Sequence, residues 1–286
     1  MQLTNTALVL EGGAMRGLFT AGVLDVFMEH HITFPACVGV SAGAAFGCNL
    51  KSCQNGRVLR YNLAYCKEPK YCSFRSLLKT GNIFGAEFCY HTIPEQLDPF
   101  DTKAFAENPM AFYIVATDVT TGKPHYQRLN MVDGDCYEWI RASASMPLVS
   151  RIVEVGGGKY LDGGVADSIP LRFMEQQYAR NVVVLTRPRD YVKEPASKLW
   201  LYKRSLKQYP NMFKAVQTRH LMYNEQRQYV FRQEQAGKAF VICPKEPLNI
   251  GRIEHNPQKI QACYDAGKQV AAACIEELKG FLQHDH

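Results

Sequence analysis

Short runs of consecutive apolar residues alternate with longer amphipathic stretches along most of the chain. A short apolar run bounded by turn residues is typical of a strand that is buried on both faces. Such strands are predicted at residues 6–11, 36–40, 111–118, 181–186 and 239–243. The amphipathic stretches predict helices at residues 18–31, 42–53, 57–66, 135–145, 171–179 and 257–282.

Strands that alternate with helices predict an α/β sandwich with a largely parallel sheet. The stretch 67–109 is rich in aromatic residues but has no clean periodicity, so it is expected to be irregular. No internal repeat, low-complexity tract or sharp change in composition marks a domain boundary in the 286 residues. A chain of this length can form a single large α/β domain.

The composition is that of a globular protein, because apolar residues make up 47% of the chain and charged residues 21%. No apolar run reaches the ~18 residues that a membrane-spanning helix needs. Residues 1–15 contain no Lys or Arg, so no targeting signal is expected. The ten cysteines form no Cys-x-x-Cys pair, which predicts free thiols and a cytoplasmic location. The spacing of Cys66, Cys72 and His91 matches no zinc pattern, so no metal site is expected.

The net charge of +6 is concentrated in one segment, residues 193–232, which holds nine basic and two acidic residues together with several aromatic rings. This mixture suits peripheral contact with an anionic membrane, such as the inner face of a cytoplasmic membrane. Nucleic-acid binding uses the same residue types, but no nucleic-acid partner is expected. The structural alternative is two solvated helices broken near Pro210, with their aromatic residues packed inward.

Residues 39–43 read Gly-Val-Ser-Ala-Gly and lie between a predicted strand and a predicted helix. The pattern G-x-S-x-G in this context is typical of a nucleophile elbow, where a strained turn exposes a serine hydroxyl. We therefore predict Ser41 as a nucleophile, with Gly39 and Gly43 at positions where larger side chains would clash. The alternative is a plain tight turn, because turns of small residues are common.

The turn after the first predicted strand, residues 12–17, reads Gly-Gly-Ala-Met-Arg-Gly. It fits neither the dinucleotide pattern G-x-G-x-x-G nor the Walker phosphate loop. Its backbone N–H groups, at the start of a predicted helix, can stabilise an oxyanion. A serine nucleophile needs such a group of donors, so the two motifs support each other.

A serine nucleophile also needs a base, and the sequence leaves two kinds of candidate. His220 and His255 follow the later aspartates, as the histidine of an α/β-hydrolase triad does, but no motif surrounds either. Asp162 ends a brief extended piece and is followed by two glycines, so it can approach another backbone closely. The alternative is an ordinary Asp-Gly turn, which the tripeptide alone favours. As a lone base it needs a partly desolvated site, because the ordinary pKa of an aspartate is ~3.9.

Taken together, these three motifs resemble those of the bacterial patatin-like phospholipases. That family carries a glycine-rich oxyanion turn after the first strand, G-x-S-x-G after the second, and D-G-G or D-G-A much later. Here the motifs occupy 12–17, 39–43 and 162–164, in the same order. The stretches 116–122 and 142–147 also look like the family's central strand and the run before its aspartate.

The resemblance covers about residues 6–190 and implies a patatin-like three-layer α/β/α sandwich with a mainly parallel central sheet. It implies a Ser-Asp dyad that hydrolyses fatty-acyl esters, with Ser41 as nucleophile and Asp162 as base. By position it also implies oxyanion donors at the amides of Gly12, Gly13 and Ala14. Arg16 occupies the family's basic position, where it would brace the loop or meet a lipid phosphate. Two positions depart from the family pattern, Ala14 for a third glycine and Ser168 for a frequent asparagine.

The expected organisation is a patatin-like catalytic core at 1–192 and a C-terminal helical extension with one further strand at 193–286, packed on the same domain. The expected function is cytoplasmic hydrolysis of phospholipids or lysophospholipids without metal or organic cofactor. Two alternatives stay open: a related esterase or acyltransferase, and a non-catalytic membrane-binding or regulatory protein on a hydrolase scaffold. The sequence indicates neither the head group and acyl length nor the oligomeric state.

Overall fold

The computed structural model describes residues 5–130 and 134–283 of the chain. The strands of this part form one eight-stranded sheet in the order β5-β6-β3-β2-β1-β7-β8, and β4 pairs with β3. Residues 1–4, part of the stretch predicted to lack a targeting signal, lie outside the described residues. The strands are β1 (Thr6–Leu10), β2 (Ala36–Val40), β3 (Ala111–Asp118), β4 (Pro124–Arg128), β5 (Val153–Val155), β6 (Gly158–Asp162), β7 (Arg180–Val184) and β8 (Ala239–Ile242).

The centre of the sheet is parallel, as the apolar runs predict. The neighbouring strands β3, β2, β1, β7 and β8 all run in the same direction. Every residue of β1 and β2 is buried, which is why their sequences show no polar alternation. The antiparallel strands β4, β5 and β6 lie beyond β3. Of these, β4 and β5 were not predicted, since β4 is half-exposed and polar and β5 is very short.

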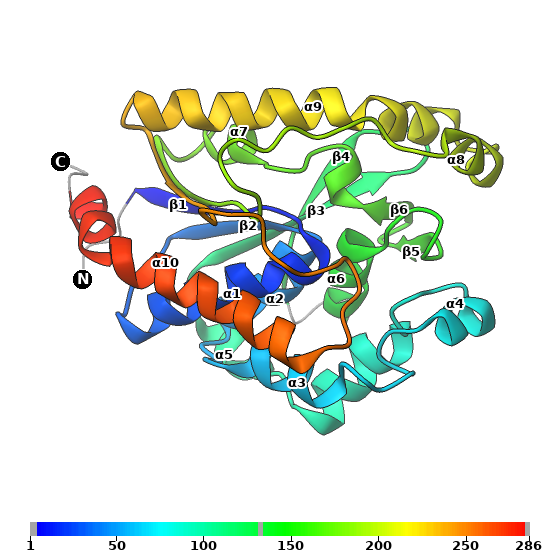
Figure 1. Ribbon diagram of the computed structural model, residues 1–286, viewed down its shortest axis with the longest axis horizontal. Helices are drawn as coiled ribbons and strands as arrows, with labels where there is room; N and C mark the ends of the chain where they lie inside the picture. The colour runs from blue at the N-terminus through cyan, green and yellow to red at the C-terminus, as the bar shows by residue number, and fades with distance from the viewer. Residues whose placement is uncertain (1–4, 131–133, 284–286) are drawn as a thin grey trace.

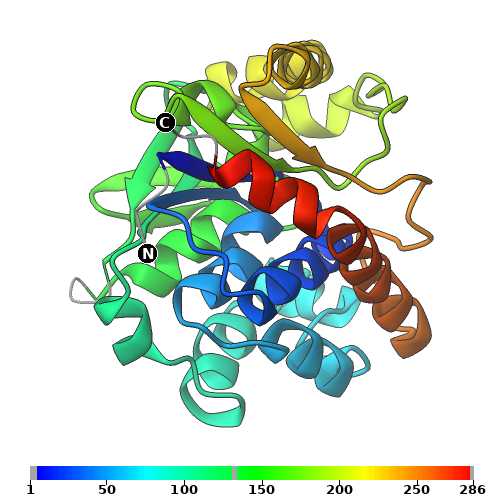
Figure 2. The same ribbon diagram turned by 90° about the vertical axis from the view of Figure 1, so that its left-hand side faces the viewer.

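Helices cover both faces of the sheet, as Figures 1 and 2 show. Side chains of β1 alternate between the two cores: Leu8 and Leu10 pack in one, Ala7 and Val9 in the other. The prediction of a three-layer α/β/α sandwich is therefore confirmed. One layer contains α1 (Gly17–Glu29), α2 (Ala42–Lys51), α3 (Arg57–Tyr65), α6 (Cys136–Ala144) and α10 (Pro257–Gln283), and the other α7 (Leu171–Met174) and α9 (Pro210–Gln235).

The stretch 67–109 is not irregular, contrary to the prediction. It contains α4 (Phe74–Thr80), a π-helix (Phe88–Leu97) and α5 (Thr102–Glu107). Each helix is too short, or too irregular in its winding, to display a period of 3.6 residues. The side chains of Ser73 and Asp101 cap α4 and α5 by accepting hydrogen bonds from backbone N–H groups. The helix predicted at 171–179 is also shorter than expected, because α7 ends at Met174.

The C-terminal part of the chain joins the same sheet and core. Strand β8 extends the sheet beside β7, and α10 packs along α1. The two helices approach at glycines: a Cβ on Gly22 would lie 2.1 Å from the carbonyl oxygen of Tyr264, and one on Gly267 would lie 2.0 Å from that of Phe19. Residues on both sides of position 192 thus share one core, while the division into 1–192 and 193–286 stays a prediction.

The basic segment 193–232 contains the end of the loop before α8, α8 itself (Leu199–Ser205) and most of α9. Helix α9 begins at Pro210, where the break was predicted, and it buries Val216, Tyr223 and Val230 at helical spacing. The other rings of the segment are half-buried, except Trp200, whose side chain is 66% exposed. Most of the aromatic residues therefore pack inward, and the basic side chains lie mainly on the outer faces.

Candidate active site

Ser41 occupies the sharp turn between β2 and α2. Its backbone angles are φ 54° and ψ −117°, a conformation that L-residues adopt only under constraint from their surroundings. The flanking glycines create that constraint by letting strand and helix come together. A Cβ on Gly39 would lie 2.4 Å from the carbonyl oxygen of Gly43, and one on Gly43 would lie 2.6 Å from that of Leu10. The local geometry is that of a nucleophile elbow.

The Ser41 hydroxyl donates a hydrogen bond to Asp162 across the sheet, with an Oγ–Oδ2 distance of 2.7 Å. Asp162 ends β6, and its second carboxylate oxygen accepts a hydrogen bond from the N–H of Gly164 at 2.8 Å. The hydroxyl of Thr117 on β3 donates to the carbonyl oxygen of Asp162 at 2.8 Å. Thr117 thus fixes the backbone of Asp162 and Gly164 fixes one carboxylate oxygen, while the other carboxylate oxygen accepts the hydrogen bond from the serine.

Ser143 on α6 is a positioning residue that the sequence analysis missed. Its hydroxyl accepts the N–H of Ser41 at 2.9 Å and donates to the carbonyl oxygen of Val115 at 2.6 Å. It thus ties the strained turn to β3. The only signal for it in the sequence is its place in the stretch 142–147, just before the aspartate motif.

Burial raises the pKa of Asp162 above that of an ordinary aspartate. The positive charge of Arg219, the hydrogen bond from Ser41 and the N–H of Gly164 lower it in turn. A buried carboxylate with a raised pKa accepts a proton more readily than an exposed one, which is the condition that a lone aspartate base requires.

Neither candidate histidine contacts the serine. Among the described residues, no hydrogen bond joins Ser41 to His220 or His255. His255 lies in the loop before α10, where its Nδ1 is 2.6 Å from the carbonyl oxygen of Cys66. His220 lies on α9, with its Nδ1 buried and without a partner in the described part of the chain. In the described chain, the geometry pairs Ser41 with Asp162.

The loop after β1 lies against the serine turn. A Cβ on Gly12 would lie 3.2 Å from the Cβ of Ser41, and Ala14 begins a short 3-10 helix (Ala14–Arg16). The N–H groups of Gly12, Gly13 and Ala14 donate to no atom of the described residues. Ala14 has φ +48°, in the left-handed region that favours glycine, so its backbone has the conformation that a glycine would adopt there. As a residue other than proline, it also keeps its N–H. The assignment of these donors to an oxyanion stays a prediction.

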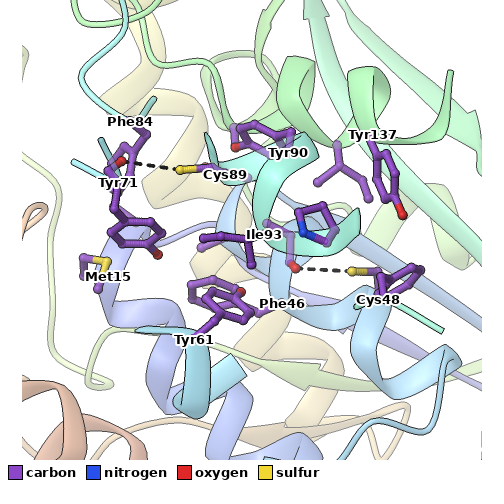
Figure 3. Close-up of a pocket in the computed structure, with 18 of the residues that line it drawn as sticks. Met15, Phe46, Cys48, Tyr61, Tyr71, Phe84, Cys89, Tyr90, Ile93 and Tyr137 are labelled. Carbon is purple, nitrogen blue, oxygen red and sulfur yellow. Dashed lines mark hydrogen bonds between the residues drawn. The ribbon is translucent and has the colours of Figure 1, made fainter. Parts of the chain in front are cut away.

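An apolar pocket opens at Ser41. Figure 3 shows its lining, in which aromatic rings predominate. Much of the wall comes from the stretch 67–109, whose function the sequence analysis did not detect. The residues of this stretch that line the pocket are Tyr71, Phe84, Cys89, Tyr90, Ile93, Pro94 and Phe100.

The chain belongs to the patatin-like phospholipase family, because the model of that family matches residues 8–174. The fold and the nucleophile elbow described above are in keeping with this. The family supports lipid acyl hydrolysis as the general activity. A second family model, a domain of unknown function called DUF6363, matches residues 209–283. The chain is 31% identical over 259 residues to the uncharacterized protein YjjU of Escherichia coli strain K12, covering 85% of this chain and 69% of that protein.

Among solved structures, VipD of Legionella pneumophila matches with 13% identity and a TM-score of 0.43, covering 94% of this chain and 67% of that one. In the described residues, no helix is long and apolar enough to span a bilayer. The cytoplasmic location stays a prediction. In the same residues no three His, Cys, Asp or Glu side chains gather closely enough to hold a metal ion.

Proposed function

We propose that this protein hydrolyses fatty-acyl esters of phospholipids or lysophospholipids through an acyl-enzyme on a Ser-Asp dyad. The observation that carries the proposal is the 2.7 Å hydrogen bond from Ser41 Oγ to Asp162 Oδ2 at a strained elbow. The apolar pocket beside the serine supports an acyl substrate, because aromatic and aliphatic side chains make up most of its lining.

In the proposed reaction, Ser41 Oγ attacks the ester carbonyl while its proton passes to Asp162. The C–O bond to the leaving alcohol then breaks as the alkoxide takes that proton. Water subsequently attacks the acyl-serine, giving its proton to Asp162, and the fatty acid leaves as Ser41 regains its hydrogen. The free amides of Gly12, Gly13 and Ala14 would stabilise the tetrahedral oxyanion in both steps.

Labelling with a fluorophosphonate and mapping the modified residue by mass spectrometry tests the nucleophile directly. We expect modification of Ser41, because its hydroxyl is the one activated by a buried carboxylate at the pocket. Folded protein that takes no label at Ser41 would contradict the proposal and favour a non-catalytic scaffold. If label appears and fatty acid is transferred to an added alcohol in preference to water, the activity is that of an acyltransferase.

We further propose that α8 contributes to peripheral contact with an anionic membrane. Trp200 is 66% exposed on this helix, and Lys203 and Arg204 lie exposed in its last turn. An indole that inserts among lipid head groups beside cations is a common interfacial arrangement. This narrows the predicted contact within 193–232, since most other rings of the segment pack inward.

Helix α4 supports the same proposal and was not foreseen from the sequence. Its side chains of Phe74 and Leu78 are 74% and 89% exposed, beside the exposed Arg75 and Lys79. In Figure 1, α4 and α8 both lie at the right-hand end of the molecule. The segments flanking α4 carry Tyr71 and Phe84 of the pocket wall, so a membrane bound there would face the acyl site.

Vesicle flotation measures this contact. In the double variant Trp200→Ala/Leu78→Ala we expect affinity for phosphatidylglycerol vesicles to fall about tenfold or more, because two large apolar side chains no longer enter the interface. Leu97→Ala is the control, since Leu97 is exposed but lies outside both helices. Wild-type protein that fails to float at low salt, or a double variant that binds as wild type does, would contradict the membrane contact.

A further inference from the structure

Five basic side chains gather beside the dyad without any acidic partner. Within the described residues, none of the five forms an ion pair or donates a hydrogen bond from its side chain. They come from four separate segments, so their proximity is a property of the fold and not of one basic helix. The five are Arg16 after β1, Arg187 and Lys193 in the loop after β7, Arg219 on α9, and Arg252 in the loop before α10.

Two carboxylates lie near the cations, Asp162 of the dyad and Glu11, and in the described residues neither forms an ion pair with them. Glu11 is already engaged by other groups. Its Oε1 accepts the hydroxyl of Tyr223 at 2.5 Å, and its Oε2 accepts the N–H and hydroxyl of Thr186. The Nε atoms of Arg16, Arg187 and Arg219 are buried without a partner in the described chain. Buried, unpaired guanidinium nitrogens are costly unless a ligand pairs with them.

The positive charges of the cluster influence one another's pKa values. Burial first, then the charge of Arg187, lowers the pKa of Arg16. Burial and the charges of Arg219, Arg252 and Arg16 lower the pKa of Lys193 to about 7, which the charge of Glu11 opposes. The ammonium of Lys193 also lies 4.9 Å from the ring of Tyr223. A bound anion would relieve this mutual repulsion.

The cluster lies beside the dyad. A Cβ on Gly164 would meet Nη2 of Arg219 at 2.9 Å and Oδ1 of Asp162 at 3.0 Å, so the guanidinium is a neighbour of the carboxylate. Arg16 ends the short 3-10 helix that begins at Ala14, which lines the pocket together with Ser41. None of the five cations is among the residues that line the apolar pocket in the described chain. The loop after β1 contributes Ala14 and Met15 to the pocket and Arg16 to the cluster.

We propose that these five cations form a subsite for the phosphate of a lipid head group with net negative charge. The inference rests on the proposed ester hydrolysis and deepens it by naming the substrate class. Cleavage at Ser41 with the acyl chain in the pocket would place the phosphate among the cations. A phosphatidylglycerol head group fits this subsite, whereas the trimethylammonium group of phosphatidylcholine meets repulsion from the remaining cations.

The test uses dihexanoyl phosphatidylglycerol and dihexanoyl phosphatidylcholine, both kept monomeric so that membrane contact has no influence. We expect wild-type kcat/KM to be at least about tenfold higher for phosphatidylglycerol. Arg187→Gln and Arg252→Gln are expected to lower kcat/KM for that lipid about tenfold each. Both keep the dyad's hydrogen bonds, because in the described residues neither arginine bonds to Ser41 or Asp162.

Two controls distinguish a loss of head-group binding from a general loss of catalytic activity. Hydrolysis of p-nitrophenyl butyrate, which carries no phosphate, is expected to stay within twofold of wild type in both variants. Lys238→Gln removes an exposed cation just before β8, at the opposite end of the parallel strands from the cluster. Equal kcat/KM for the two lipids in wild type, or variants that lower both esters alike, would overturn the head-group assignment.

Binding tests the subsite even if no ester is hydrolysed. Titration calorimetry with full-length Ser41→Ala uses a short-chain diether analogue of phosphatidylglycerol and, separately, inorganic phosphate. At pH 8 we expect proton uptake on binding of the analogue, because a nearby anion raises the pKa of Lys193 from about 7. Binding of inorganic phosphate but not of the analogue would assign the cluster to free phosphate and overturn the proposal, as would binding of neither.

Discussion

Replacement of Ser41 by alanine is expected to lower ester hydrolysis at least about 10⁴-fold, since the variant has no oxygen to form the acyl-enzyme. The loss falls on kcat, while binding of the diether lipid is retained because the pocket and the cationic cluster are untouched. Release of fatty acid from dihexanoyl phosphatidylglycerol, followed under saturating substrate, measures the change.

Ser150→Ala serves as the matched control, since in the described residues Ser150 forms no hydrogen bond with the dyad and is not one of the residues that line the pocket. Thermal unfolding of both variants shows whether the fold is intact. Hydrolysis by Ser41→Ala within tenfold of wild type would mean that the nucleophile lies elsewhere.

Replacement of Asp162 by asparagine is expected to lower hydrolysis about 10³-fold or more and to abolish fluorophosphonate labelling at Ser41. An amide can keep a hydrogen bond to the serine but takes no proton from it. If labelling persists, a histidine base, His220 or His255, replaces the dyad in the mechanism. Variants His220→Gln and His255→Gln then identify which.

The pH dependence follows from the sign of the shift at Asp162. Because burial raises its pKa, activity is lost as pH falls through a value above that of an ordinary aspartate, and the acid limb of kcat/KM reports this value. The same shift means that the folded protein holds its proton more tightly than the unfolded chain.

Stability therefore falls as pH rises from the unfolded pKa to the folded one, and at neutral pH the buried charge is a cost. Asp162→Asn removes it, so we expect a melting temperature at pH 7.5 that is equal to or higher than that of wild type. A markedly lower melting temperature would show that the carboxylate is needed for folding and not only for catalysis.

Features of the fold that depend on neighbouring residues could be predicted from the sequence. The strand at 111–118 and the turn at 39–43 stand out because an apolar run and a pair of glycines carry their own signal. The contact between Ser41 and Asp162, 121 positions apart, could be predicted only through the resemblance to a family, since no local pattern links the two.

Features that depend on distant packing could not be predicted. The sequence of the pocket wall at 67–109 has no helical periodicity, because α4 is only two turns long and the next helix is a π-helix. The cationic cluster was visible only as excess charge in one segment, whereas Arg16, Arg187 and Arg252 lie outside it. Only the fold brings them together, by joining the loops at the carboxyl ends of the parallel strands.

The glycine contacts between α1 and α10 also bear on how the protein is made. Helix α1 follows directly on the loop beside Ser41 and is buried along residues 17–27, yet α10 begins only at residue 257. Translation adds ~5–20 residues per second, so the side of α1 that packs against α10 stays exposed for on the order of tens of seconds before α10 has been synthesised. Until α10 is in place, the nascent chain exposes this apolar flank, so we expect a product that ends before residue 257 to be prone to aggregation and proteolysis and not to act as a smaller hydrolase.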